Sequence, residues 1–240
     1  ALIGIVVLLL LFFFIGFKEL MTTIMSFQWY FALYLIPLYL LTDLLSALTL
    51  KALLYPIKSI PVLRLFKYNI LVQGLSSFVP GRMGELSLIY FFKKEGIPLG
   101  KGSALFIIDK IISIGLILSI GFFGLFPLIG VKQIAQIVGL FVFLVVVGLY
   151  FLFTQQGRDF LVKKVLRRFA ARFKGFYRTF ISYLSNEKKF MFLDLFFTIL
   201  RWVVTCALMW VFFLSYGVTV PFLGVVLLNS IVFLITFIPI

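Results

Sequence analysis

The stretch SFVPGRMGEL, residues 77–86, places a Pro-Gly pair, an arginine and a glutamate inside a strongly apolar chain. Of the 240 residues, 63% are hydrophobic and only 12% are charged. Several separate apolar runs have the length that an α-helix needs to cross a bilayer. These Leu, Phe and Val runs lack the alternation of apolar and polar residues that a membrane β-barrel shows. A soluble domain this apolar would have too few polar residues to cover its surface. The sequence therefore predicts an all-α, polytopic helical membrane protein.

The formal net charge of +14 does not indicate nucleic-acid binding, because the basic residues lie in short segments between apolar runs, as in cytoplasmic loops. Histidine is absent and Cys206 is the only cysteine, which excludes disulfides, the usual zinc ligand sets and His-based hydrolysis. No metal or cofactor is expected. The N-terminal run lacks the basic region and cleavage site of a signal peptide. We expect the chain to start within a membrane-spanning helix, and both of its ends to lie within a longer protein.

Membrane spans are expected where long apolar runs end near interfacial aromatic residues. Five runs fit this description: residues 1–17, 29–50, 102–126, 134–153 and 191–216. Two further apolar stretches, 68–92 and 222–240, contain prolines. Residues 154–190 carry ten Lys and Arg residues, with apolar residues at helical spacing. This segment predicts an amphipathic helix on the cytoplasmic surface, which either only fixes the topology or also binds lipid.

The distribution of basic residues decides how residues 68–92 sit in the membrane. A full crossing would leave 14 basic residues inside and 5 outside, whereas a re-entrant hairpin gives 17 inside and 2 outside. The hairpin is favoured, with Pro80 and Gly81 at its tip, because proline lacks an amide hydrogen and glycine tolerates the turn. The same topology brings residues 222–240 in from the opposite face. The chain is then a single transmembrane domain, residues 1–240, with an inverted repeat: about 29–101, and about 191–240, the second one truncated.

Ionisable residues inside a bilayer are costly and mark pathways or binding sites. Arg82 and Glu85 are three residues apart, on one face of a half-helix that is expected to start at the hairpin tip. One interpretation is a mutual salt bridge that holds the hairpin together. The other is a phosphate site, because an arginine at the positive end of a helix dipole is unfavourable unless an anion binds there. Glu85 would then complement the dipole or meet a cationic head group.

Three further charged residues are candidates for the same site. Asp109 and Lys110 are neighbours, and adjacent helical positions point about 100° apart, so they are not expected to face one partner. One of them would face the hairpin, while Lys110 could instead snorkel to the interface. Asp43 lies inside the second span. It either contacts the substrate or pairs with a basic residue such as Lys110 or Arg82.

Three segments carry a resemblance to a known family: FVPGRMGEL (78–86), KKEGIPLGKGSALFIIDKIISIG (93–115) and the final FIPI (237–240). Together they resemble the lysylphosphatidylglycerol synthase transmembrane region, a flippase-like family of integral membrane proteins. The resemblance spans nearly the whole chain and is most specific over residues 79–110. The family's second proline segment continues into a Gly-rich turn ending in Glu, just beyond residue 240. By position, the polar motif of the family falls on Pro80, Arg82, Gly84, Glu85, Asp109 and Lys110; Gly81 and Asp43 complete the expected substrate-binding set.

The resemblance implies a lipid translocase in the cytoplasmic membrane, with its basic loops inside. The substrate would be an anionic or aminoacylated phospholipid, or a polyprenyl-phosphate-linked lipid, and self-association into a homo-oligomer is compatible with this role. No enzyme activity is expected, because this chain does not include the soluble aminoacyl-transfer domain of bifunctional members. Two alternatives remain open. One is a membrane-embedded transferase that uses Glu85 or Asp109 on a lipid-linked donor, and the other is a non-transporting scaffold that docks a partner.

Overall fold

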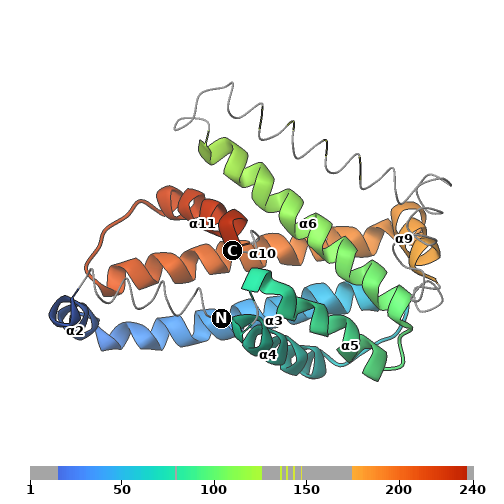
Figure 1. Cartoon of the computed structure of the whole chain (residues 1–240), viewed down its shortest axis with the longest axis horizontal. Coiled ribbons are helices and arrows are strands. Elements are labelled where there is room, and N and C mark those ends of the chain that lie inside the picture. The colour runs from blue at the N-terminus through green and yellow to red at the C-terminus, as the bar shows by residue number, and fades with distance from the viewer. Residues whose placement is uncertain are drawn as a thin grey trace. The chain divides into compact units, whose positions relative to one another are not determined.

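The computed structural model describes residues 16–78, 80–125, 136, 139, 143, 147 and 175–236, and every regular element within these residues is a helix. The expected all-α class is confirmed for this part of the chain. The elements are α2 (Phe17–Met25), the 3-10 helix η1 (Trp29–Phe31), α3 (Ala32–Leu54), α4 (Val62–Phe78), the 3-10 helix η2 (Pro80–Leu86), α5 (Ser87–Lys94), α6 (Leu99–Leu125), α9 (Phe176–Ser185), α10 (Lys188–Ser215) and α11 (Phe222–Thr236) (Figure 1).

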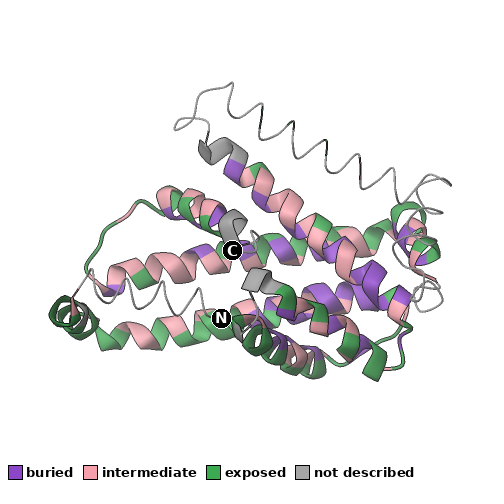
Figure 2. Cartoon of the chain, viewed as in Figure 1, coloured by how far each residue is buried: buried purple, intermediate pink, exposed green. Residues whose placement is uncertain are grey.

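Three helical segments among the described residues are long and apolar enough to cross a membrane: Trp29–Leu54, Leu99–Gly121 and Lys188–Ser215. They coincide with the expected spans at 29–50, 102–126 and 191–216, which supports an integral membrane protein. Many large apolar side chains on α3 and α10 are exposed, as they would be against lipid (Figure 2). The expected spans at 1–17 and 134–153 lie almost entirely outside the described residues, as does most of the basic segment 154–190.

The chain forms two compact units, and α3 and α10 each contribute to both. The first unit consists of Ala1–Leu48, Pro61–Ser87 and Phe196–Ile240. It contains α4, η2 and α11 together with the N-terminal part of α3 and most of α10. The second unit consists of Thr49–Ile60 and Leu88–Leu195, and so contains α6 and α9.

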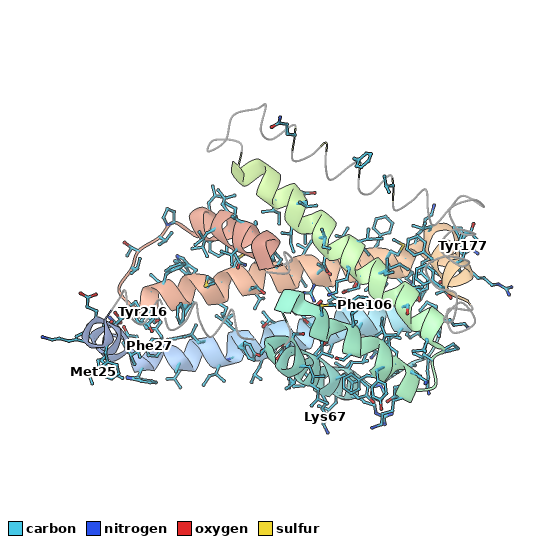
Figure 3. The ribbon with its side chains drawn as sticks, viewed as in Figure 1. Met25, Phe27, Lys67, Phe106, Tyr177 and Tyr216 are labelled. Carbon is cyan, nitrogen blue, oxygen red and sulfur yellow. The ribbon has the colours of Figure 1, made fainter. Side chains whose placement is uncertain are left out.

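In the first unit, the C-terminal end of α10 is held by contacts on both sides. The backbone N–H of Gln28 donates to the Ser215 carbonyl at 3.0 Å. The rings of Phe27 and Tyr216 lie 5.5 Å apart beside this bond (Figure 3). α11 then runs back along α10, and the indole N–H of Trp210 donates to the Val220 carbonyl at 3.0 Å (Figure 1). Aromatic side chains with a polar edge suit this end of a span, where water meets lipid.

The motif PGRMGEL forms η2, which folds back on the C-terminal end of α4. A Cβ atom at Gly84 would lie only 2.4 Å from the backbone nitrogen of Ser76, so glycine is what allows this close approach. The chain therefore reverses its direction directly after α4, where the hairpin tip was expected. The α-helix was expected to begin at the tip, but it begins only at Ser87. Pro80 has no amide hydrogen and glycine is a poor α-helix former, which favours the short 3-10 segment.

In the second unit, α9 packs against α6 and is tied to the end of α3. The buried hydroxyl of Tyr183 donates to the Leu53 carbonyl, and the rings of Tyr55 and Phe190 stack with centroids 5.5 Å apart. Burial, with the nearby negative charge of Glu187, raises the pKa of Tyr183 far above its ordinary value. The phenol therefore stays protonated and remains a donor at physiological pH.

The close contact at Gly84 gives a test of the reversal after α4. Gly84→Ala should destabilise the protein by about 1–3 kcal/mol, because the added methyl group collides with backbone atoms that cannot move aside. The matched control is Gly74→Ala in α4, where no atom lies within 4 Å of the added methyl group and alanine is the better helix former. Thermal unfolding in detergent measures both variants. Equal melting temperatures for the two would contradict the close packing of η2 on α4.

Candidate functional site

A buried carboxylate lies in the middle of the α3 span. The side chain of Asp43 is 1% exposed, and its Oδ1 atom accepts a hydrogen bond from the side-chain amide of Gln73 on α4. The Gln73 carbonyl oxygen in turn accepts a hydrogen bond from the Tyr39 hydroxyl at 2.9 Å. The Oδ2 atom of Asp43 has no hydrogen-bond partner among the described residues. One amide therefore ties α4 to two positions on α3, and it leaves one carboxylate oxygen available.

Gln73 belongs to a polar stripe on α4, formed by Asn69, Gln73 and Ser76. Their spacing of four and three residues places them on one helix face. The Asn69 side chain is 8% exposed and its amide nitrogen has no acceptor within the described part of the chain. The buried Ser76 hydroxyl likewise has no partner there. Unsatisfied polar groups are expensive in an apolar environment, so this face is suited to meeting a polar ligand or water.

A positive charge reaches the same face of α3 from α10. The guanidinium of Arg201 donates to the Ser46 hydroxyl at 3.2 Å. Ser46 is three residues after Asp43, so the two side chains are neighbours on the helix surface. The arginine is thus held about one helical turn from the carboxylate, and the first unit contains a cluster of Tyr39, Asp43, Ser46, Gln73 and Arg201.

The motif residues Pro80, Gly81, Arg82, Gly84 and Glu85 all lie in η2, at the end of the polar stripe. The close approach of Gly84 to Ser76 brings the turn to the last polar residue of that stripe. Glu85 is partly exposed, and the side chain of Arg82 lies outside the described residues. In the first unit, α4 thus contacts both Asp43, through Gln73, and the proline-glycine motif, through Ser76.

Asp109 and Lys110 lie on α6, in the second unit. Lys110 Nζ is 3.2 Å from Asp109 Oδ2 and also lies over the Phe106 ring, 5.3 Å from its centroid; Figure 3 labels this phenylalanine. Asp109 is 3% exposed. The two side chains leave the helix in different directions, yet the long lysine chain curves back to its neighbour. The carboxylate therefore has a counter-charge within its own helix.

Of two other predicted features, the structure describes the one at Asp43. Asp43 was expected to contact the substrate or to pair with a basic residue, and its hydrogen-bond partner in the described part of the chain is the neutral Gln73. Residues 237–240, which contain the second proline of the expected repeat, lie outside the described residues.

Sequence reasoning missed Tyr39, Asn69, Ser76 and Gln73, because none of them carries a charge. A signal for three of them was present. Asn69, Gln73 and Ser76 recur at four and three residues in an otherwise apolar stretch, which predicts a polar stripe on a membrane helix. Tyr39 on α3 had no comparable signal, since pairing between two helices leaves no spacing rule in the sequence.

The family model of the lysylphosphatidylglycerol synthase transmembrane region matches residues 1–240, the whole of this chain. The chain has no significant match among curated protein sequences or solved structures.

The Tyr39–Gln73–Asp43 connection can be tested by removing its centre. Gln73→Leu should destabilise the protein by about 1–3 kcal/mol, because the carboxylate of Asp43 and the hydroxyl of Tyr39 both lose a partner. The matched control is Gln28→Leu, which breaks an exposed Tyr30–Gln28 hydrogen bond of the same kind and should cost much less.

Unfolding in mixed micelles measures these variants together with the double variant Asp43→Leu/Gln73→Leu. The double variant should recover part of the loss, because no buried carboxylate is left without a donor. Strictly additive losses would contradict a direct interaction between the two residues.

Proposed function

Because this chain belongs to the lysylphosphatidylglycerol synthase transmembrane-region family, we propose that it is a lipid translocase. It moves an anionic or aminoacylated phospholipid, or a polyprenyl-phosphate-linked lipid, between the two leaflets of the cytoplasmic membrane. Its role is transport and not a chemical step on the lipid. The observation that carries this proposal is the polar stripe on α4, which runs through apolar surroundings from Asn69 to the Pro80–Leu86 turn.

A lipid head group crosses a bilayer only if polar groups replace the water that it leaves behind. The stripe supplies such groups at about one per helical turn, with amide and hydroxyl donors at Asn69 and Ser76 that have no partner among the described residues. Asp43 adds a carboxylate oxygen, an acceptor that likewise has no partner among the described residues. Acyl chains can stay in the lipid meanwhile, because exposed apolar side chains cover the outer surfaces of α3 and α10.

The phosphate of the lipid binds at Arg82, at the end of the stripe. A guanidinium can form two parallel hydrogen bonds to a phosphate, which a helix dipole cannot do. This assignment no longer needs a helix N-terminus at the tip, since α5 begins seven residues after Pro80. Glu85, three residues from Arg82, faces the cationic part of an aminoacylated head group.

The fold that carries this site is an inverted repeat with two re-entrant hairpins, over residues 29–101 and 191–240. Likenesses between α4 and α11 support it. Each helix directly follows a proline, Pro61 or Pro221. The fourth residue of each is fully buried, and the eighth is in both cases an asparagine that is 8% exposed: Leu65 and Val225, Asn69 and Asn229. Helices that share the position of a rare buried asparagine are what a duplicated hairpin predicts.

The re-entrant topology can be tested by cysteine labelling in a Cys206→Ala background. Ser59 and Lys94 flank the first hairpin, and both are exposed. If the hairpin returns to its side of entry, cysteines at both positions react with a membrane-impermeant maleimide from the cytoplasmic side. Accessibility from opposite sides would refute the hairpin.

The phosphate assignment is tested by neutralising Arg82 and Glu85 together. If the two residues only pair with each other, the double variant Arg82→Gln/Glu85→Gln should regain stability and transport. If Arg82 binds phosphate, the double variant should fold but lose transport, while Arg82→Lys keeps part of it because a point charge remains. A leaflet-resolved assay of fluorescent phosphatidylglycerol in vesicles measures this. Near-normal transport by the double variant would refute the phosphate site.

A further inference from the structure

We infer that Asp43 is the proton-binding group of the transport cycle, and that its Oδ2 atom takes up and releases the proton. An O–H bond forms on Oδ2 when a proton arrives from water on one side, and it breaks when the proton leaves to water on the other. This inference rests on the proposed function, because it names the ion that drives that transport. It follows from four features of the first unit: the burial of the carboxylate, the charges around it, its access and its link to α10.

The first feature is the depth of the carboxylate. Asp43 lies fourteen residues after Trp29 and eleven before Leu54, near the centre of the candidate span Trp29–Leu54. It is 1% exposed. An ionised carboxylate at this depth is among the most costly groups that a membrane helix can carry. Uptake of a proton removes that cost without any rearrangement of the backbone.

The second feature is the set of groups that face the carboxylate. On its own helix, the neighbouring titratable group is the Tyr39 phenol, and α4 presents the neutral amide of Gln73. From α10, the Arg201 guanidinium donates to the Ser46 hydroxyl at 3.2 Å, about one helical turn from the carboxylate. Within the described part of the chain, the carboxylate is thus hydrogen-bonded on one oxygen only, and the donor is a neutral amide.

The third feature is a route to the carboxylate. Tyr39 is 50% exposed and Gln73 is also exposed, whereas Asp43 beneath them is buried. The pair therefore covers the carboxylate on the exposed side of α3 and α4. Rotation of the Gln73 side chain would break two hydrogen bonds and open Oδ2 to a water molecule. A side-chain rotation of this kind is fast compared with movements of whole helices.

The fourth feature couples the charge of Asp43 to the position of α10. The Arg201 guanidinium is held at Ser46, about one helical turn from the carboxylate. When Asp43 is ionised, it attracts this guanidinium strongly, because the surrounding medium has a low dielectric constant. When Asp43 is protonated, this attraction is lost and α10 is held to α3 less strongly. Two states of one side chain thus favour two arrangements of α3 and α10, as alternating access requires.

The experiment uses the whole chain in vesicles of phosphatidylethanolamine and phosphatidylglycerol with a trace of fluorescent phosphatidylglycerol. A pH gradient of either sign is imposed, and the leaflet distribution of the probe is measured. With one proton moved per lipid, one pH unit should shift the steady-state leaflet ratio about tenfold, and reversing the gradient should reverse the shift. Asp43→Asn should abolish this response. The variant is isosteric and its amide oxygen can still accept the Gln73 hydrogen bond, so it is expected to fold.

The matched control is Glu19→Gln, which removes a carboxylate from the exposed surface of α2 and should respond to pH as the wild type does. A second measurement does not depend on transport. The infrared band of a protonated carboxylic acid, assigned to Asp43 by its loss in Asp43→Asn, should be present at neutral pH and disappear as the pH is raised.

Three results would overturn the inference: a pH response that survives in Asp43→Asn, a leaflet ratio that follows a sodium gradient and not the pH gradient, or no infrared band from Asp43 at any pH. If the wild type moves no lipid under any gradient while the infrared band titrates as expected, the proposed function fails and Asp43 stands as a proton-binding group.

Discussion

The carboxylate of Asp43 is the constraint around which the first unit is arranged. A charged or polar atom in the middle of a membrane span needs a partner, and Gln73 is chemically suited to be that partner. Its side-chain amide donates to Asp43 and accepts from Tyr39 at the same time. An apolar side chain could form neither bond, and a lysine could only donate. These two hydrogen bonds fix the rotation of α4 about its axis. The rotation then decides that Asn69 and Ser76 lie on the polar face with Gln73.

The Pro80–Leu86 turn depends on the same helix. α4 ends where proline removes an amide hydrogen, and the chain folds back so closely that Gly84 lies against the backbone of Ser76. The residues of PGRMGEL therefore have two separate roles. Proline and the glycines allow the reversal, whereas Arg82 and Glu85 give the turn its charges. The polar stripe of α4 and the charged turn that follows it are therefore adjacent in space.

Composition and charge distribution predict the helical class and three of the spans, because an apolar run long enough to cross a bilayer has few other stable structures. The reversal at Pro80 follows from proline and glycine chemistry. The pairing of Gln73 with Asp43 could not be found in this way, since an uncharged amide in a helix says nothing of its partner on another helix. For Asp109 and Lys110, the direction of Cα–Cβ bonds was a poor guide, because four methylene groups let lysine reach its own neighbour.

Two of the three buried aspartates in the described spanning helices, Asp43 and Asp109, thus have different kinds of partner. Asp109 has a lysine next to it, with Lys110 Nζ 3.2 Å from its Oδ2 atom, so the two opposite charges meet within one helix. Asp43 has a neutral amide instead, and its nearest described guanidinium is held one turn away by a serine. A carboxylate whose partner is an amide can exist in either protonation state, because the amide can hydrogen-bond both, and this tolerance is what a residue that changes its charge during a cycle requires.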